Sequence, residues 1–164
     1  MSKKRIAVIP GSFDPITKGH VSLVERALME YDEIYLAVMI NPSKQYLFTL
    51  EQRTAIAIAA LRSYERVKVI SSEGMLWELA EKLGACAIVK GYRNQTDYEY
   101  ELKMAVFNAE HNPDAPTVLY RSDESLVDVS STVVRERLHK GLTLEPYLPL
   151  ETIPLIECYF SEKQ

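Results

Sequence analysis

Residues 5–20 read RIAVIPGSFDPITKGH, a short apolar run followed by a loop of glycine, proline and polar residues. After its arginine the run 5–10 is continuously apolar, which is typical of a strand buried on both faces of a sheet. Residues 21–31, VSLVERALMEY, then space their apolar side chains as a helix does. The stretch therefore predicts a buried strand, a polar loop and a helix in succession.

The loop itself has the residues of an anion-binding turn. Gly11 and Gly19 allow the backbone to approach a ligand closely, and Pro15 stiffens the path between them. Gly19 and His20 fall where the helix begins, and free N–H groups and the helix dipole favour anions there. A histidine at this place can donate a hydrogen bond to a phosphate, or it can simply cap its helix.

The alternation of strand and helix continues along the chain. Further strands are predicted over 33–40, 66–70, 86–91 and 117–120, with helices from Thr49 and over 75–84, 97–111 and 130–141. The tail 142–164 contains three prolines, so any helix there should be short or begin late. This pattern predicts an α/β fold in which residues 1–164 form a single domain around one doubly wound, five-stranded parallel sheet. The ligand of such a sheet lies beyond the carboxyl ends of its strands.

Composition and charge narrow the class of partner. The net charge is −4, with 19 basic and 23 acidic residues, so the composition lacks the excess of basic residues that is typical of a nucleic-acid-binding domain. No stretch approaches the ~20 apolar residues of a membrane span, and the apolar run after the basic N-terminus is too short for a secretory signal. We therefore expect a cytoplasmic protein whose partners are neither nucleic acid nor membrane.

Polar and unusual residues gather after the predicted strands. Besides 10–20, these segments are NPSKQY at 41–46, KGYRNQTDYEYE at 90–101 and RSDESLVDVSST at 121–132. The carboxyl ends of parallel strands meet at one edge, so all four segments should share one crevice.

Motifs in these four segments together resemble those of a known family. GSFDPITKGH at 11–20 resembles the (H/T)xGH signature of the nucleotidyltransferase superfamily, with Thr17 in the first position, and VSSTVVR at 129–135 resembles its second motif. NPSKQYLFTLEQR at 41–53 and KGYRNQTDYEYE at 90–101 look like the phosphopantetheine adenylyltransferase family in particular. The resemblance runs from about residue 5 to residue 140 and implies a Rossmann-like nucleotidyltransferase fold.

The resemblance implies a reaction and a set of site residues. An enzyme of this family transfers the adenylyl group from ATP to 4′-phosphopantetheine by direct in-line displacement, the penultimate step of coenzyme A biosynthesis. His20 would donate a hydrogen bond to the reacting phosphate, and Lys44 would orient the nucleophile; these two are the expected catalytic residues. The expected ATP-binding residues are Ser12, Phe13, His20, Gly91, Tyr92, Arg93, Glu101, Leu126, Val127, Asp128, Val129, Ser130, Ser131 and Thr132. The expected phosphopantetheine-binding residues are Ser12, Lys44, Leu76 and Lys90.

Several of these residues also have a purely structural interpretation. The hydroxyls of residues 130–132 could cap the last predicted helix, although no glutamate or glutamine follows at the position that completes a capping box. Lys44 could be an ordinary solvated lysine, and Leu76 could belong to the helix core. Lys90 stands where the family usually has arginine. Its ammonium keeps the positive charge of that arginine but cannot form the two parallel hydrogen bonds of a guanidinium.

Cofactor, assembly and rival functions complete the expectations. The sequence has no carboxylate group with the spacing of a dedicated magnesium site, so Mg²⁺ should arrive with ATP and no protein metal site is expected. The resemblance implies a homohexamer. The alternatives are another small-molecule adenylyl- or cytidylyltransferase of the same superfamily, or a non-catalytic nucleotide-binding regulator on the same fold.

Overall fold

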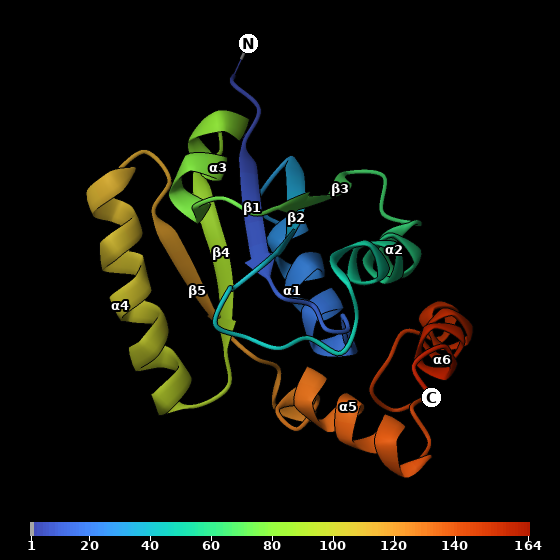
Figure 1. Ribbon diagram of the computed structural model, residues 1–164. Coiled ribbons are helices and arrows are strands. Elements are labelled where there is room, and N and C mark those ends of the chain that lie inside the picture. The colour runs from blue at the N-terminus through green and yellow to red at the C-terminus, as the bar shows by residue number, and fades with distance from the viewer. Residues whose placement is uncertain (1) are drawn as a thin grey trace.

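A parallel sheet forms the centre of the molecule in the computed structural model, which describes residues 2–164 (Figure 1). Its strands lie in the order β3-β2-β1-β4-β5, and every neighbouring pair is parallel. The strand bounds are β1 Ile6–Gly11, β2 Glu33–Met39, β3 Val67–Ser72, β4 Ala87–Tyr92 and β5 Thr117–Arg121. The sheet is the predicted one. Its order reverses at β1, where a doubly wound fold binds its ligand.

Helices cover both faces of the sheet. They are α1 Lys18–Leu28, α2 Leu50–Leu61, α3 Leu76–Leu83, α4 Gln95–His111, α5 Ser131–Lys140 and α6 Ile153–Ser161. Within β1, the side chains of Ala7 and Ile9 join a core with residues of α1, α2, α5 and α6. Val8 points to the other face and packs with residues of β4 and α3. A strand buried on both faces explains why residues 5–10 read as one apolar run.

Capping residues set the starts of several helices. Thr49 and Gln52 form the predicted capping box, in which each backbone N–H donates to the other residue's side chain at 3.1 Å. The helix predicted over 97–111 begins earlier, at Gln95, because the Asn94 side chain accepts from the backbone N–H of Asp97 at 2.9 Å. The helix predicted over 21–31 likewise begins at Lys18, so the first turn of α1 contains His20.

The tail packs on the rest of the fold. The α6 helix has nine residues and Pro154 in its first turn, which confirms the expectation of a short, late helix. Leu148 and Ile156 are fully buried in the core shared with α1 and α2. The backbone N–H of Lys18 donates to the carbonyl of Tyr147 at 3.0 Å, so the tail also holds the start of α1.

Within residues 2–164, none of the helices combines the length and the apolar character needed to cross a membrane.

Candidate active site

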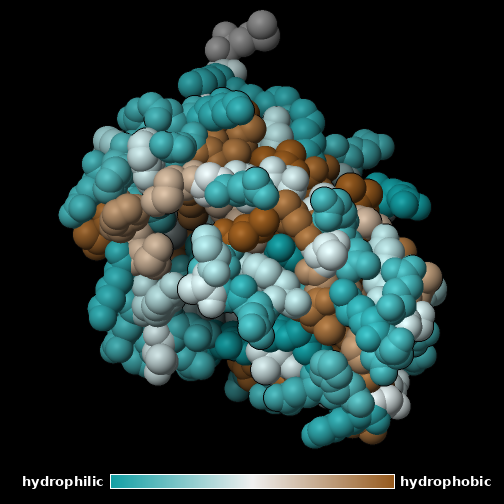
Figure 2. Space-filling view, in the orientation of Figure 1, coloured by the Kyte–Doolittle hydropathy of each residue, from teal (hydrophilic) through white to brown (hydrophobic). Residues whose placement is uncertain are grey.

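The loops that follow the strands meet at the carboxyl edge of the sheet. In Figure 1 the segment between β2 and α2 crosses this edge, with the start of α4 on one side and the start of α5 on the other. Figure 2 shows a hollow with hydrophilic residues in the same region. The polar segments predicted to share a crevice therefore lie around one.

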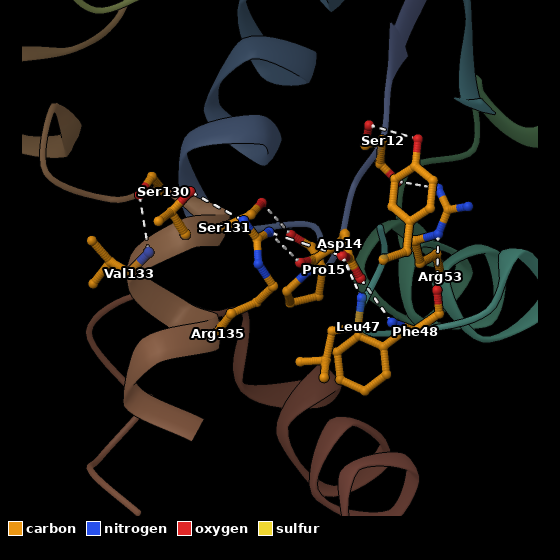
Figure 3. Close-up of polar contacts among 12 residues, drawn as sticks. Ser12, Asp14, Pro15, Leu47, Phe48, Arg53, Ser130, Ser131, Val133 and Arg135 are labelled. Atoms are coloured by element: carbon orange, nitrogen blue, oxygen red, sulfur yellow. Dashed lines mark hydrogen bonds and ion pairs between the residues drawn. The ribbon is translucent and has the colours of Figure 1, made fainter. Parts of the chain in front are cut away.

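The first loop, residues 12–17, is fixed by side chains from distant segments (Figure 3). The carboxylate of Asp14 accepts from the backbone N–H groups of Leu47 at 2.8 Å and Phe48 at 3.0 Å. Arg135 of α5 donates to the carbonyl of Asp14 at 2.9 Å, and its guanidinium lies 3.9 Å from the Asp14 carboxylate. Asp14 is almost fully buried. Its contacts join the first loop to the residues before α2 and to α5.

Close packing explains the glycine at the end of β1. A Cβ atom at Gly11 would lie 2.9 Å from the Phe13 ring, so any larger residue there would displace the ring. Phe13 has a φ of 47°, an uncommon conformation for a residue with a side chain. Its buried ring packs edge-on against His20, with 4.9 Å between ring centroids. The fixed Phe13 ring therefore forms one wall beside the histidine.

The ring of His20 is held in one tautomer. Its Nδ1 accepts from the backbone N–H of Thr17 at 2.9 Å and lies 3.2 Å from the Thr17 hydroxyl oxygen. Since Nδ1 is the acceptor, the proton of the neutral ring is on Nε2. Burial, together with the nearby positive charge of Arg93, lowers the pKa of His20 to about 4. His20 therefore caps its helix through one nitrogen and remains a neutral donor through the other.

Lys44 lies exposed on the loop between β2 and α2. The side chain of Asn41 accepts from the backbone N–H and the hydroxyl of Ser43, at 3.0 and 2.7 Å, and so forms a tight turn. The backbone N–H of Lys44 donates to the Asn41 carbonyl at 3.0 Å. The turn fixes the backbone, while the Lys44 ammonium remains at the surface, where it can reach a phosphate.

The end of β4 contributes two cations, each paired with a carboxylate of α4. The ammonium of Lys90 lies 3.1 Å from Glu101, and both side chains are largely buried. Arg93 pairs with Asp97 at 3.1 Å through Nε alone, so its two terminal nitrogens keep their donors for another partner. Glu101 was predicted at the nucleotide, and the structure places it against the Lys90 ammonium. Gly91 and Tyr92 lie between the two cations in β4.

The hydroxyl side chains at the start of α5 have partners within the protein. The Ser130 hydroxyl oxygen accepts from the Val133 N–H at 3.2 Å, so the capping interpretation is confirmed for this residue. The Ser131 hydroxyl donates to the carbonyl of Pro15 at 2.8 Å, and the Thr132 oxygen accepts from Arg135 at 3.1 Å. The cap uses the Val133 N–H, while the N–H groups of Ser131 and Thr132 lie too early in α5 to reach a carbonyl of their own helix and are the natural donors for an anion.

The remaining predicted residues lie at two places. Leu126 ends the short 3₁₀ turn Glu124–Leu126, and Val127, Asp128 and Val129 lie between this turn and α5. A Cβ atom at Gly19 would lie 3.4 Å from the Val129 carbonyl, so this segment runs beside the start of α1. Leu76 begins α3 and packs with the core on the other face of the sheet, as the helix-core interpretation expected.

Three carboxylates near this crevice, those of Asp14, Asp97 and Glu101, have protein partners. Within residues 2–164 no three His, Cys, Asp or Glu side chains are grouped closely enough to hold a metal ion. Asp14 faces backbone N–H groups and Arg135, and Glu101 faces Lys90. The donor set does not fit a resident Mg²⁺ ion, whereas an ion held by substrate phosphates and water needs no such set.

Comparison with known proteins identifies the family. A family model described as cytidylyltransferase-like matches residues 8–137. The phosphopantetheine adenylyltransferase of Francisella philomiragia is 39% identical over 159 residues, 96% of this chain and 98% of that protein. The enzymes of that name from Heliobacterium modesticaldum and Francisella tularensis subsp. novicida are 41% and 40% identical, over 96% of this chain in each case and 92% and 94% of their own lengths. This chain belongs to the phosphopantetheine adenylyltransferase family.

Sequence reasoning missed the residues that support the site of this phosphopantetheine adenylyltransferase family member. In the sequence, Asp14 and Arg53 each belong to one of the motifs, and the resemblance implies no role for either. A signal for Arg53 did exist, because it lies three and four residues before the buried Ile56 and Ala57, on the apolar face of α2. A charged side chain on a buried helix face needs hydrogen-bond partners, and the segments that supply these partners are the ones that the side chain holds in place.

Proposed function

We propose that this chain transfers the adenylyl group from ATP to 4′-phosphopantetheine, giving dephospho-coenzyme A and pyrophosphate, as the penultimate step of coenzyme A biosynthesis. Relatives of this name match along nearly the whole chain at about 40% identity. The observation that carries the chemistry is the tautomer of His20, which presents an Nε2–H donor beside the anion-binding turn.

The reaction needs no base from the protein. A phosphate oxygen of phosphopantetheine, ionised at neutral pH, forms a bond to the α-phosphorus of ATP. The bond from that phosphorus to the bridging oxygen breaks in line, and pyrophosphate leaves with the electron pair. Catalysis then consists of positioning the two phosphates and stabilising the charge at the α-phosphoryl group. No covalent enzyme intermediate forms.

The chain's residues divide this work. His20 donates from Nε2 to an oxygen of the α-phosphate as it gains charge, and its low pKa keeps it a neutral donor. Lys44 holds the attacking phosphate as a mobile point charge. Lys90, oriented by Glu101, holds the acceptor from the end of β4. The terminal nitrogens of Arg93 and the first N–H groups of α5 hold the β- and γ-phosphates.

The remaining ligand contacts are assigned by position. Ser12 and Phe13 line the turn after β1, and Leu76 lies at the start of α3, where a pantetheine arm can run. We assign Mg²⁺ to ATP rather than to a protein site, because the carboxylates of Asp14 and Glu101 at the crevice are engaged with protein donors.

We also propose a cytoplasmic homohexamer. The α4 helix exposes Tyr100, Leu102, Met104, Val106 and Phe107, which is an unusual amount of apolar surface for one helix of a monomer. Contacts between subunits would cover such a face, and the mass of the protein in solution measures the number of subunits.

Replacing His20 by alanine tests the chemistry. The change removes a donor used mainly in the transition state, so kcat with MgATP and phosphopantetheine should fall on the order of 10²–10³-fold, with a smaller change in KM. His139→Ala is the matched control, since His139 also packs edge-on against a phenylalanine, Phe160, but near the end of α5. A His20→Ala enzyme with the wild-type kcat would remove His20 from the reaction.

A further inference from the structure

Arg53 is a buried guanidinium among apolar side chains. It is 1% exposed and lies at the end of the first turn of α2, on the face that buries Ile56, Ala57 and Ala60. No carboxylate of the described chain forms an ion pair with it. A buried charge is costly unless hydrogen bonds compensate for its lost hydration, so its partners must be strong and well placed.

Those partners are three carbonyl groups from three separate segments. Nη1 donates to Ser12 at 2.7 Å and to Met39 at 3.0 Å, and Nε donates to Phe48 at 3.2 Å. Ser12 lies in the first loop, Met39 ends β2, and Phe48 precedes α2. Figure 3 shows Arg53 beside Ser12 and Phe48. One rigid fork therefore joins both ends of the loop 40–49 to the turn after β1.

Tyr46 extends the same unit to the turn that carries Lys44. Its ring covers the Arg53 guanidinium, with 3.9 Å from Cζ to the ring centroid. Its hydroxyl oxygen accepts from the backbone N–H of Asn41 at 2.7 Å and lies 3.5 Å from the Ser12 hydroxyl. Asn41 in turn accepts from the Lys44 backbone. The contacts run without a gap from Ser12 through Arg53 and Tyr46 to the Lys44 turn.

We infer that Arg53 is a positioning residue that sets the nucleotide-binding turn at Ser12 and the acceptor-binding turn at Lys44 in one fixed relation. The inference rests on the proposed roles of these two turns. In-line displacement requires the two phosphates to be aligned, and a misplacement of about 1 Å can cost 10²-fold in rate. Arg53 is buried beneath the turns, so it acts through the backbone and not by touching a substrate.

Replacing Arg53 by lysine separates the positioning role of the guanidinium from the effect of its positive charge. A single ammonium keeps the charge but has neither the planar fork that reaches three carbonyls nor a flat face to stack on Tyr46. We expect Arg53→Lys to lower kcat on the order of 10–100-fold. The KM for each substrate and the Kd for ATP should change by less than about 3-fold, because the groups that touch the substrates remain.

Arg66→Lys is the matched control. Arg66 also donates to three carbonyls, those of Leu28, Tyr31 and Asp32 at 3.2, 3.0 and 3.5 Å, but just before β3, at the opposite edge of the sheet. Arg66→Lys loses the same kind of fork and should keep the wild-type kcat.

Tyr46→Phe is a second test variant. It keeps the ring over Arg53 and loses the hydrogen bond to Asn41. Like Arg53→Lys, it should lower kcat and leave the Kd for ATP unchanged.

The measurements are kcat, both KM values, the Kd for ATP by calorimetry, and the melting temperature of each variant. A folded Arg53→Lys enzyme with the wild-type kcat would overturn the inference, as would a loss confined to KM or an equal loss in Arg66→Lys. If Arg53→Lys does not fold, the kcat of Tyr46→Phe decides in the same way. Wild-type enzyme is assayed alongside, and its failure to release pyrophosphate would refute the proposed function instead.

Discussion

His20 has two ring nitrogens with different tasks. Nδ1 takes the place that a glutamate or glutamine side chain has in a capping box, accepting from the backbone N–H of Thr17. The capping role and the phosphate role were alternatives at the level of the sequence. In the structure they are compatible, because the cap fixes the tautomer that leaves Nε2–H available.

The lowered pKa of His20 gives a direct test at this scale. In ¹⁵N NMR of the free enzyme, the His20 ring should titrate with a midpoint near pH 4 and be the Nε2–H tautomer above it. Loss of its signals in His20→Asn assigns them. Because the folded pKa is below the ordinary value of 6.5, the contribution to stability is present above pH 6.5 and is lost as the pH falls toward 4. A midpoint near 6.5 would contradict the account.

Among the elements, the loop 40–49 connects the two halves of the site. Both its ends are tied to Arg53, and its middle presents Lys44 to the solvent. Backbone contacts thus determine where the Lys44 ammonium can reach, although its side chain is exposed.

Lys44→Ala should therefore affect one substrate more than the other. The KM for phosphopantetheine should rise on the order of 10–100-fold, since a hydrogen bond to a charged group contributes about 1.5–3 kcal/mol. The Kd for ATP, measured by calorimetry without acceptor, should stay within about 2-fold. Lys82→Ala, a lysine in the last turn of α3, is the control. An equal loss of ATP affinity would refute the assignment of Lys44 to the acceptor.

At the scale of elements, the sequence predicted the order of strands and helices because each signal was local. The apolar run of β1, the Thr49 capping box and the glycines after α3 and α5 each mark an element within a few residues. The starts of α1 and α4 came earlier than predicted, since the polar first turn of each helix carries no apolar periodicity.

The site was predictable in its location and less so in its contacts. Parallel topology places the ends of β1, β2, β4 and β5 at one edge, which sequence order alone implies. The partners of Ser131 and Arg53 are distant in sequence, at Pro15 and Ser12, and no local pattern encodes such pairs. Supporting contacts of this kind appear only once the chain is folded.

For the whole molecule, one sheet edge brings the turn after β1, an exposed lysine and two paired cations around a common crevice. The tail contributes from outside the recognised motifs, because the Tyr147 carbonyl holds the first turn of α1, in which His20 lies. The fold alone is compatible with other acceptors, and the family relation favours phosphopantetheine.

The most direct measurement is pyrophosphate release from MgATP with 4′-phosphopantetheine, nicotinamide mononucleotide or glycerol 3-phosphate as acceptor. We expect stoichiometric pyrophosphate and dephospho-coenzyme A, with kcat/KM for phosphopantetheine on the order of 10³-fold or more above the values for the other two acceptors. Equal or faster turnover of another acceptor, or ATP binding without pyrophosphate release when phosphopantetheine is added, would contradict it.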